Sequence, residues 1–164
     1  MARRNLHVWS ADGFIPPASN APEYDEGDTS LRNWLGFDAS TVETTYSKPT
    51  ALPTYTGTLK VDVHYFMASA TSGSVDWEVS VEAVSAGDAL DMTGSPSFDT
   101  ANANHGTVPG TAGYLGVITI TLTNLDSAAV GDTIRLKVER DADDGTNDTA
   151  TGDALLYMIV LYAE

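Results

Sequence analysis

The residues of this chain best suited to chemistry are the carboxylates of an acidic segment near its C-terminal end. Asp141, Asp143 and Asp148 lie there within Asp-Ala-Asp-Asp-Gly-Thr-Asn-Asp. Hard oxygen ligands on a flexible loop suit Ca²⁺. The spacing departs from an EF-hand, because Gly145 stands in place of the third ligand and Gly152 in place of the terminal glutamate. We therefore predict either a calcium site at Asp141, Asp143 and Asp148 or an ordinary solvated acidic loop.

Two further groups of acidic residues offer alternative sites. One lies near the N-terminal end and could coordinate an ion in the same way: Glu23, Asp25, Glu26 and Asp28. The other consists of Asp76, Glu78 and Glu82, which alternate along one predicted strand and therefore project from one face of it. Glycoside cleavage requires paired carboxylates, but alternating acids are also the ordinary solvated side of a strand.

Other catalytic arrangements are not indicated by the residue spacing. His7, His64 and His105 lie far apart and in no pattern such as His-Glu-x-x-His. The serines include no Gly-x-Ser-x-Gly sequence, and the glycine-rich residues 106–113 lack the lysine of a phosphate-binding loop. Cysteine is absent, which excludes a disulfide framework and a thiolate zinc site. We expect a protein that is not an enzyme and needs no cofactor, calcium excepted.

The charge balance narrows the classes of partner. The chain has 164 residues, 23 of them acidic and 8 basic, and its formal net charge is −15. Such a chain repels phosphate backbones and anionic lipids, so we expect neither nucleic acid nor membrane as a partner. No segment reads as an export signal or a membrane anchor, and the absence of cysteine is compatible with folding in a reducing cytoplasm.

The elements that would position these residues are strands, because apolar and polar residues alternate through most of the chain. The alternation is clearest in residues 59–65 and 75–83, with a hairpin turn between them. No segment has a sustained helical stripe. Further strands are predicted at residues 5–9, 31–37, 97–103, 115–125, 133–140 and 154–163. A count of about eight strands predicts an all-β, jelly-roll-like antiparallel β-sandwich.

Residues 1–53 differ from the rest of the chain in their proline and aromatic content. Prolines punctuate residues 11–53, and proline removes backbone donors that central strands need. Aromatic residues are frequent in the same region, which favours packing onto a folded surface over a free linker. We predict an irregular, proline-rich N-terminal arm at residues 1–53 that wraps the sandwich or a neighbour, and one β-sandwich domain at residues 54–164.

The final predicted strand, residues 154–163, is apolar on both faces. Strict alternation would place Leu155, Tyr157, Ile159 and Leu161 on one face and Leu156, Met158, Val160 and Tyr162 on the other. A strand that is apolar on both faces must be covered twice, by its own core and by something else. We assign the first set to the core and predict that Leu156, Met158, Val160 and Tyr162 form the interface of a homo-oligomer, with a trimer expected.

The aromatic residues suggest a different function, which is carbohydrate binding. Several of them could form a platform on which sugar rings stack, the usual way in which a β-sandwich lectin holds carbohydrate. Trp77 lies on the apolar side of its predicted strand, which favours the core for this residue. The remaining candidates are Trp9, Trp34, Tyr55, Tyr65, Tyr114 and Tyr162.

From about Tyr55 to the C-terminus, the chain carries a series of short motifs. They include Ser-Gly-Ser-Val-Asp-Trp at residues 72–77, Gly-Asp at 131–132, Arg-Asp at 140–141 and Asp-Thr-Ala-Thr-Gly-Asp-Ala at 148–154. In content and order these motifs resemble a group of small structural proteins of tailed bacteriophages and prophages. The resemblance implies a jelly-roll-like sandwich that acts as a head decoration or cement protein, or as a module of a tail or fibre.

On this resemblance we expect a virion protein, made in the host cytoplasm, that stabilises the head lattice. Its partners would be further copies of itself and the major capsid protein or another virion protein. Trp9, Phe14 and Trp34 of the N-terminal arm would contact the capsid. The alternative is a carbohydrate-binding module of a tail fibre or spike that recognises the host surface.

Overall fold

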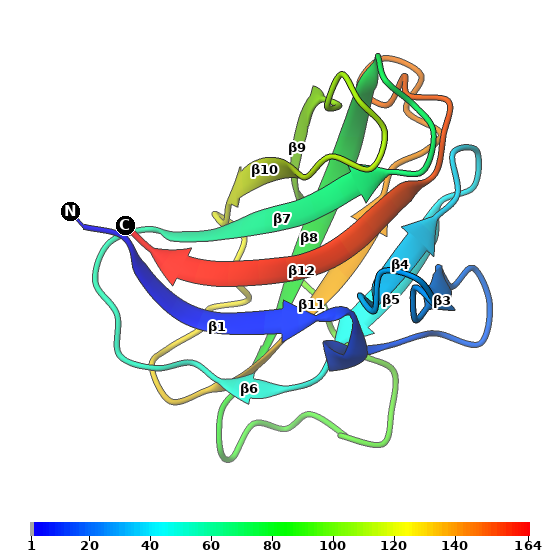
Figure 1. The fold of residues 1–164 in the computed structure, drawn as a ribbon. Helices are drawn as coiled ribbons and strands as arrows, with labels where there is room; N and C mark the ends of the chain where they lie inside the picture. Colours follow the sequence, from blue (N-terminus) through cyan, green and yellow to red (C-terminus); the bar gives the residue numbers. More distant parts are fainter. Residues whose placement is uncertain (1) are drawn as a thin grey trace.

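Two antiparallel sheets pack face to face in the computed structural model, which describes residues 2–164 (Figure 1). Sheet A contains β1 (Arg4–Ser10), β3 (Glu23–Asp25), β4 (Trp34–Phe37), β7 (Leu59–Met67), β10 (Gly116–Thr121) and β12 (Ala154–Ala163). Sheet B contains β2 (Phe14–Ile15), β5 (Glu43–Ser47), β6 (Thr50–Ala51), β8 (Ser74–Val84), β9 (Asn102–Thr107) and β11 (Thr133–Arg140). The one helical turn among these residues is the 3-10 helix η1 (Ala11–Gly13). The all-β sandwich prediction is confirmed.

The N-terminal third belongs to the sandwich, which corrects the prediction of an irregular arm at residues 1–53. This region supplies β1 to β6, and β1 pairs with β12 from Arg4 opposite Ala163 to Ser10 opposite Met158. Figure 1 shows β1 alongside β12, on the side away from β7. The prolines punctuate this region without excluding strands, because they lie between them: β2 ends before Pro16, and β6 begins after Pro49. These short strands raise the count above the predicted eight.

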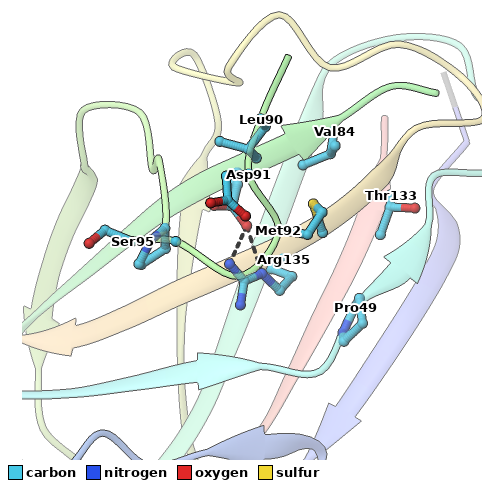
Figure 2. Close-up of a pocket in the computed structure, with 11 residues that line it drawn as sticks. Pro49, Val84, Leu90, Asp91, Met92, Ser95, Thr133 and Arg135 are labelled. Carbon is cyan, nitrogen blue, oxygen red and sulfur yellow. Dashed lines mark hydrogen bonds and ion pairs between the residues drawn. The ribbon is translucent and has the colours of Figure 1, made fainter. Parts of the chain in front are cut away.

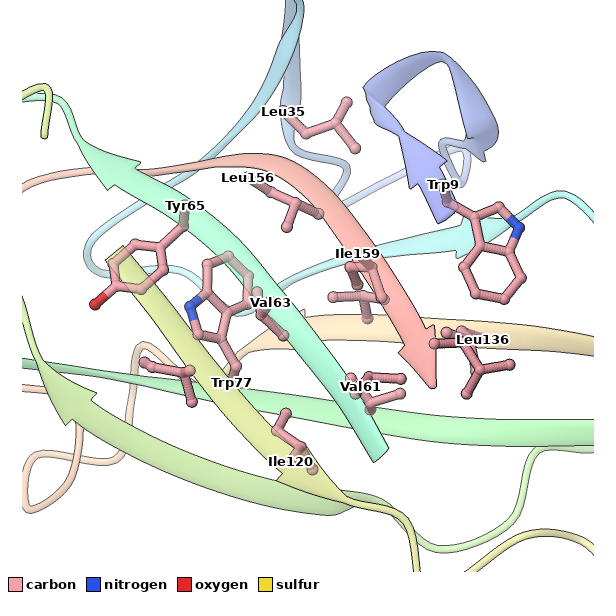
Figure 3. Close-up of a cluster of buried hydrophobic side chains, with 14 of the residues drawn as sticks. Trp9, Leu35, Val61, Val63, Tyr65, Trp77, Ile120, Leu136, Leu156 and Ile159 are labelled. Carbon is pink, nitrogen blue, oxygen red and sulfur yellow. The ribbon is translucent and has the colours of Figure 1, made fainter. Parts of the chain in front are cut away.

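The core lies between the sheets and is centred on aromatic residues from both of them. Trp77 of β8 is fully buried, as its position on the apolar side of the strand predicted. The rings of Phe37 and Tyr65 meet its indole edge to face, at centroid distances of 5.0 and 6.0 Å. Figure 3 shows Trp77 and Tyr65 packed together among branched aliphatic side chains. The two sheets therefore share one hydrophobic core.

The final strand, β12, contains a bulge that changes which residues face inward. Leu156 lies opposite Tyr65 of β7, but the next pair joins Met158 to His64, so Tyr157 is the extra residue. Before the bulge Leu156 points into the core, and after it Ile159 does (Figure 3). Leu156 is therefore a core residue of its own domain, which corrects its assignment to an oligomer interface.

A buried ion pair closes one end of the sandwich. Arg140, at the end of β11, holds Asp148 through two bonds of 2.8 Å, from Nε to Oδ2 and from Nη2 to Oδ1. The guanidinium also donates to the carbonyl oxygens of Ala150 and Gly152, at 2.9 Å each. Both side chains of the pair are almost wholly buried. The pair ties the acidic loop between β11 and β12 to the core.

No helix of the described residues is long and apolar enough to span a membrane.

Candidate functional site

The outer face of sheet A, which points away from the core, carries a groove of ≈ 490 Å³. It is lined by three aromatic side chains, a leucine, a cation and two small residues: Trp34, Phe66, Tyr157, Leu115, Arg32, Ser30 and Gly113. This volume lies in the range of small-molecule sites, and a mainly apolar wall with few polar groups is typical of them. We take this groove as the candidate functional site.

The strands of sheet A place the aromatic rings of the groove. Leu155 of β12 lies between Phe66 of β7 and Gly36 of β4, and Trp34 is two residues before Gly36 on the same face. The rings of Trp34 and Phe66 meet edge to face, with centroids 5.4 Å apart. Tyr157 lines the same groove and is the extra residue of the bulge in β12. The bulge therefore brings a third aromatic side chain to the groove.

Two loops form the sides of the groove. The amide of Gly113 donates to the carbonyl oxygen of Met67 at 2.9 Å, which fixes the loop before β10 at the end of β7. Leu115 follows and is 56% exposed. On the other side, the amide of Arg32 donates to Ser30 Oγ at 3.3 Å. Within the described chain, the Arg32 guanidinium forms no ion pair, so its charge is available to a ligand. The groove can thus offer ring faces and hydrogen-bond donors together.

Beyond the groove, the outer face of sheet A mixes apolar residues with polar ones such as Lys60 and Asp62. Val8 of β1 and Val117 of β10 are each 48% exposed. Met158, Val160 and Tyr162, three of the predicted interface residues, lie on this face, as their cross-strand partners show. The Arg3 guanidinium covers Tyr162, 3.8 Å from its ring centroid, and pairs with Asp62. Val160 and Tyr162 are already buried within the chain, at 5% and 3% exposure, which corrects their assignment to an oligomer interface. Met158 is only partly buried, and an interface through it stays a prediction.

The predicted capsid contacts separate into two groups. Trp9 and Phe14 are buried in the core, and Trp9 Nε1 donates to the carbonyl oxygen of Lys48 at 3.0 Å. They cannot contact a capsid in this fold, because β1 and β2 turn them inward; this corrects the prediction for both. Trp34 lies in the groove and is accessible.

The three aspartates predicted to bind calcium are not brought together. Asp148 is held by Arg140, so its carboxylate is already occupied. Asp141 instead lies near Asp76 and Asp144, and oxygen atoms of these three lie within 4.8 Å of one another. A hydrogen bond with Asp143, together with burial, raises the pKa of Asp141 to about 6. Sequence spacing alone did not reveal Asp76, because it is distant along the chain.

The other two acidic groups predicted from the sequence do not form catalytic or metal sites among the described residues. Glu82 accepts from Arg135 Nε at 2.7 Å and from the Ser97 amide at 2.7 Å, so it is neutralised rather than free for catalysis. Figure 2 shows Arg135 in a smaller pocket of ≈ 190 Å³ on the sheet B side, beneath the loop with Leu90 and Met92. The N-terminal acids, Glu23 to Asp28, form no converging cluster among the described residues.

Of the aromatic residues predicted as a sugar platform, only Trp34 lines the groove. Trp9 and Tyr65 belong to the core. Sequence reasoning missed Phe66, Tyr157 and Arg32. Phe66 did leave a signal, because it occupies the polar side of its alternating strand, where an aromatic residue points out of the core.

Solved structures that match the chain include proteins in complex with saccharides. The isomalto-dextranase of Arthrobacter globiformis T6, solved with panose, matches with 19% identity and a TM-score of 0.50. The match covers 96% of this chain and 23% of that enzyme, so the chain spans under a quarter of the enzyme's length. This likeness supports the β-sandwich fold.

Two carbohydrate-binding modules match at 10% identity. TmCBM61, in complex with β-1,4-galactotriose, has a TM-score of 0.45 and is matched over 94% of this chain and 91% of its own. The family 11 module of Clostridium thermocellum, in complex with a β-1,3-1,4-mixed-linked tetrasaccharide, has a TM-score of 0.41, with 95% and 88% covered. No protein-family model and no curated protein matches the chain.

Proposed function

We propose that this protein is a non-catalytic carbohydrate-binding module, which holds a glycan in the groove on the outer face of sheet A. The observation that carries the proposal is the convergence of Trp34, Phe66 and Tyr157 beside the Arg32 guanidinium. Sugar rings present apolar C–H faces that pack on aromatic side chains, and their hydroxyl groups accept from a guanidinium. In the setting that the phage resemblance implies, the module would sit at a tail fibre or spike and recognise the host surface.

The test is a glycan array followed by calorimetric titration of any glycan that binds. We expect Trp34→Ala and Tyr157→Ala each to weaken binding about tenfold, because an aromatic contact contributes about 0.5–1.5 kcal/mol beyond the area it buries. Tyr114→Ala is the matched control, since Tyr114 is 66% exposed beside the groove without lining it. Array-wide absence of selective binding, or an equal loss in the control, would contradict the proposal.

A second candidate function is the head decoration or cement protein that the phage resemblance implies. The observation that favours it is a pair of exposed apolar side chains outside the groove: Val8, opposite Val160 of β12, and Val117, opposite His64 of β7. Exposed apolar patches of this kind mark interaction sites. The partners would be further copies of this chain, in a trimer, and the major capsid protein or another virion protein.

Sedimentation and imaging separate this second function from the first. Met158→Asp and Val8→Asp should dissociate an oligomer while the domain stays folded; Val130→Asp is the control, because Val130 is 53% exposed in a distant turn. Antibody labelling of virions would show the position: label over the head supports decoration, and label at the tail tip supports host recognition. A monomer at all concentrations would contradict the trimer.

A further inference from the structure

A group of three carboxylates lies on the sheet B side of the molecule, away from the groove. Asp76 belongs to β8, whereas Asp141 and Asp144 belong to the loop that follows β11. One oxygen atom from each lies within 4.8 Å of the others. The amide of Asp141 donates to the carbonyl oxygen of Asp76 at 3.1 Å, which holds the loop against the strand. Two segments far apart in sequence therefore present carboxylates to one point.

Asp76 has the environment of a ligand that needs a cation. Asp76 is only 4% exposed, and its Oδ1 atom has no hydrogen-bond partner in the described chain. Burying an unpaired carboxylate is costly, so such groups are usually paired or bound to metal. His105 lies opposite Asp76 on β9, but it is exposed to solvent and forms no ion pair with it. Burial raises the pKa of Asp76, which His105 only partly offsets.

The loop holds its own carboxylate in place. Asp144 Oδ1 accepts from the amides of Thr146 and Asn147, at 2.9 and 3.2 Å, and Oδ2 accepts from Asn147 Nδ2 at 2.8 Å. These bonds lower the pKa of Asp144, so this side chain stays ionised. Oδ1 uses both of its lone pairs in these bonds, whereas Oδ2 retains one for a further partner. Asp144 is thus fixed in position before any ion arrives.

We propose that Asp76, Asp141 and Asp144 bind one Ca²⁺ ion. Ca²⁺ takes oxygen ligands in a flexible geometry, at bond lengths of about 2.3–2.6 Å, whereas Mg²⁺ demands near-ideal octahedral geometry. Three carboxylate oxygens within 4.8 Å of one another, two of them on a loop, can therefore share one Ca²⁺ ion. Three carboxylates leave positions for water or backbone oxygens, as calcium coordination requires.

The bound ion would act as a structural clamp. It would join β8 to the start of the loop, while Asp148 at the far side of the loop is already joined to Arg140 and to the amide of Asp76. It would also offset the negative charge that Glu78 and Asp143 place near Asp141. The clamp is independent of the groove, because its residues belong to sheet B and its loop.

Thermal unfolding with added Ca²⁺, against a chelator, tests the site. At saturating calcium we expect the melting temperature to rise by about 5–10 °C. Asp76→Asn should abolish the rise. Because this change removes a buried charge, the variant without calcium should be at least as stable as the wild type, so the lost response cannot be ascribed to misfolding. Asp28→Asn, at an exposed acidic position, should keep the full rise.

Two results would overturn the proposal. One is a wild-type melting temperature that does not respond to calcium, and the other is a full response retained by Asp76→Asn. An equal response to Mg²⁺ would overturn the assignment to calcium. Glycan binding by the groove is measured separately, so failure of the ion site leaves the proposed function untouched.

Discussion

The two outer faces of the sandwich differ in chemistry although one core supports both. On sheet A the face presents aromatic and aliphatic side chains, among them Trp34, Phe66 and Val8. On sheet B the corresponding face presents charged pairs, such as Arg135 with Glu82 and Lys137 with Glu139. Apolar contact depends little on salt, whereas the strength of charge pairs depends on pH, salt and ions. Ion pairs also occur on sheet A, as between Arg3 and Asp62, but they do not line the groove. We therefore propose ligand binding by the groove on sheet A and expect electrostatic stabilisation mainly on sheet B.

The largest expected effect concerns the ion pair that lies beneath the acidic loop. Replacing Arg140 with methionine leaves Asp148 buried without a partner, which should reduce the free energy of unfolding by about 3–5 kcal/mol. Lys137→Met is the control on the outer face of sheet B, where the partly exposed pair with Glu139 contributes about 0–1 kcal/mol. Urea unfolding measures both. Equal losses would mean that burial does not distinguish the two pairs.

Neighbouring leucines of β12 test the bulge that separates the core from the groove face. Leu156 is fully buried, so Leu156→Ala should cost about 2–5 kcal/mol of unfolding free energy. Leu155 lies on the outer face and is only partly buried, so Leu155→Ala should cost about 1 kcal/mol or less. If the order were reversed, the inward and outward assignment of β12 would be wrong.

The acidic loop should make stability depend on pH in a known direction. The folded-state pKa of Asp141 is raised to about 6 from an ordinary value of 3.8. Between these values the folded state binds more protons than the unfolded state, so stability without calcium falls as pH rises from about 4 to 7. Asp141→Asn should flatten this part of the profile. The melting temperature against pH, in chelator, measures it; an unchanged slope contradicts the pKa assignment.

The smallest effect is expected at Arg3, which covers part of the sheet A face. Arg3→Ala removes a partly exposed pair with Asp62 and uncovers Tyr162, so we expect a loss of about 1 kcal/mol or less. The loss should shrink at high salt, because the pair is screened. Unfolding at two ionic strengths, with Arg4→Ala as control, tests this. An unchanged loss at high salt would show that packing on Tyr162 dominates.

Most of the sandwich could be predicted from residue alternation. The strands at 59–65, 75–83 and 133–140 follow the expected pattern, and Trp77 lies in the core as predicted. In the N-terminal third, the predictions at residues 5–9 and 31–37 correspond to β1 and β4, whereas β2, β3, β5 and β6 were not predicted, because they are short and contain few alternating residues. What makes these four segments strands is pairing with other segments, as in β5 with β11.

The candidate site could be predicted from the sequence less completely than the fold. Trp34 was proposed as a sugar-stacking residue, but Phe66 and Tyr157 join it only through the pairing of β7, β12 and β4. The bulge in β12 reverses the alternation halfway along the strand, and the apolar sequence on both sides of it gives no sign of where it falls. For the same reason Leu156 was assigned to the wrong face.

The fold class, the net charge and the acidic segments could be predicted from the sequence, because alternation and composition are local properties. Which of these groups meet depends on the tertiary structure. It paired Asp148 with Arg140, turned Trp9 inward and brought Asp76 to Asp141 across strands more than sixty residues apart. Such contacts depend on strand register and on the bulge, and both are set by packing of the whole sandwich rather than by neighbouring residues.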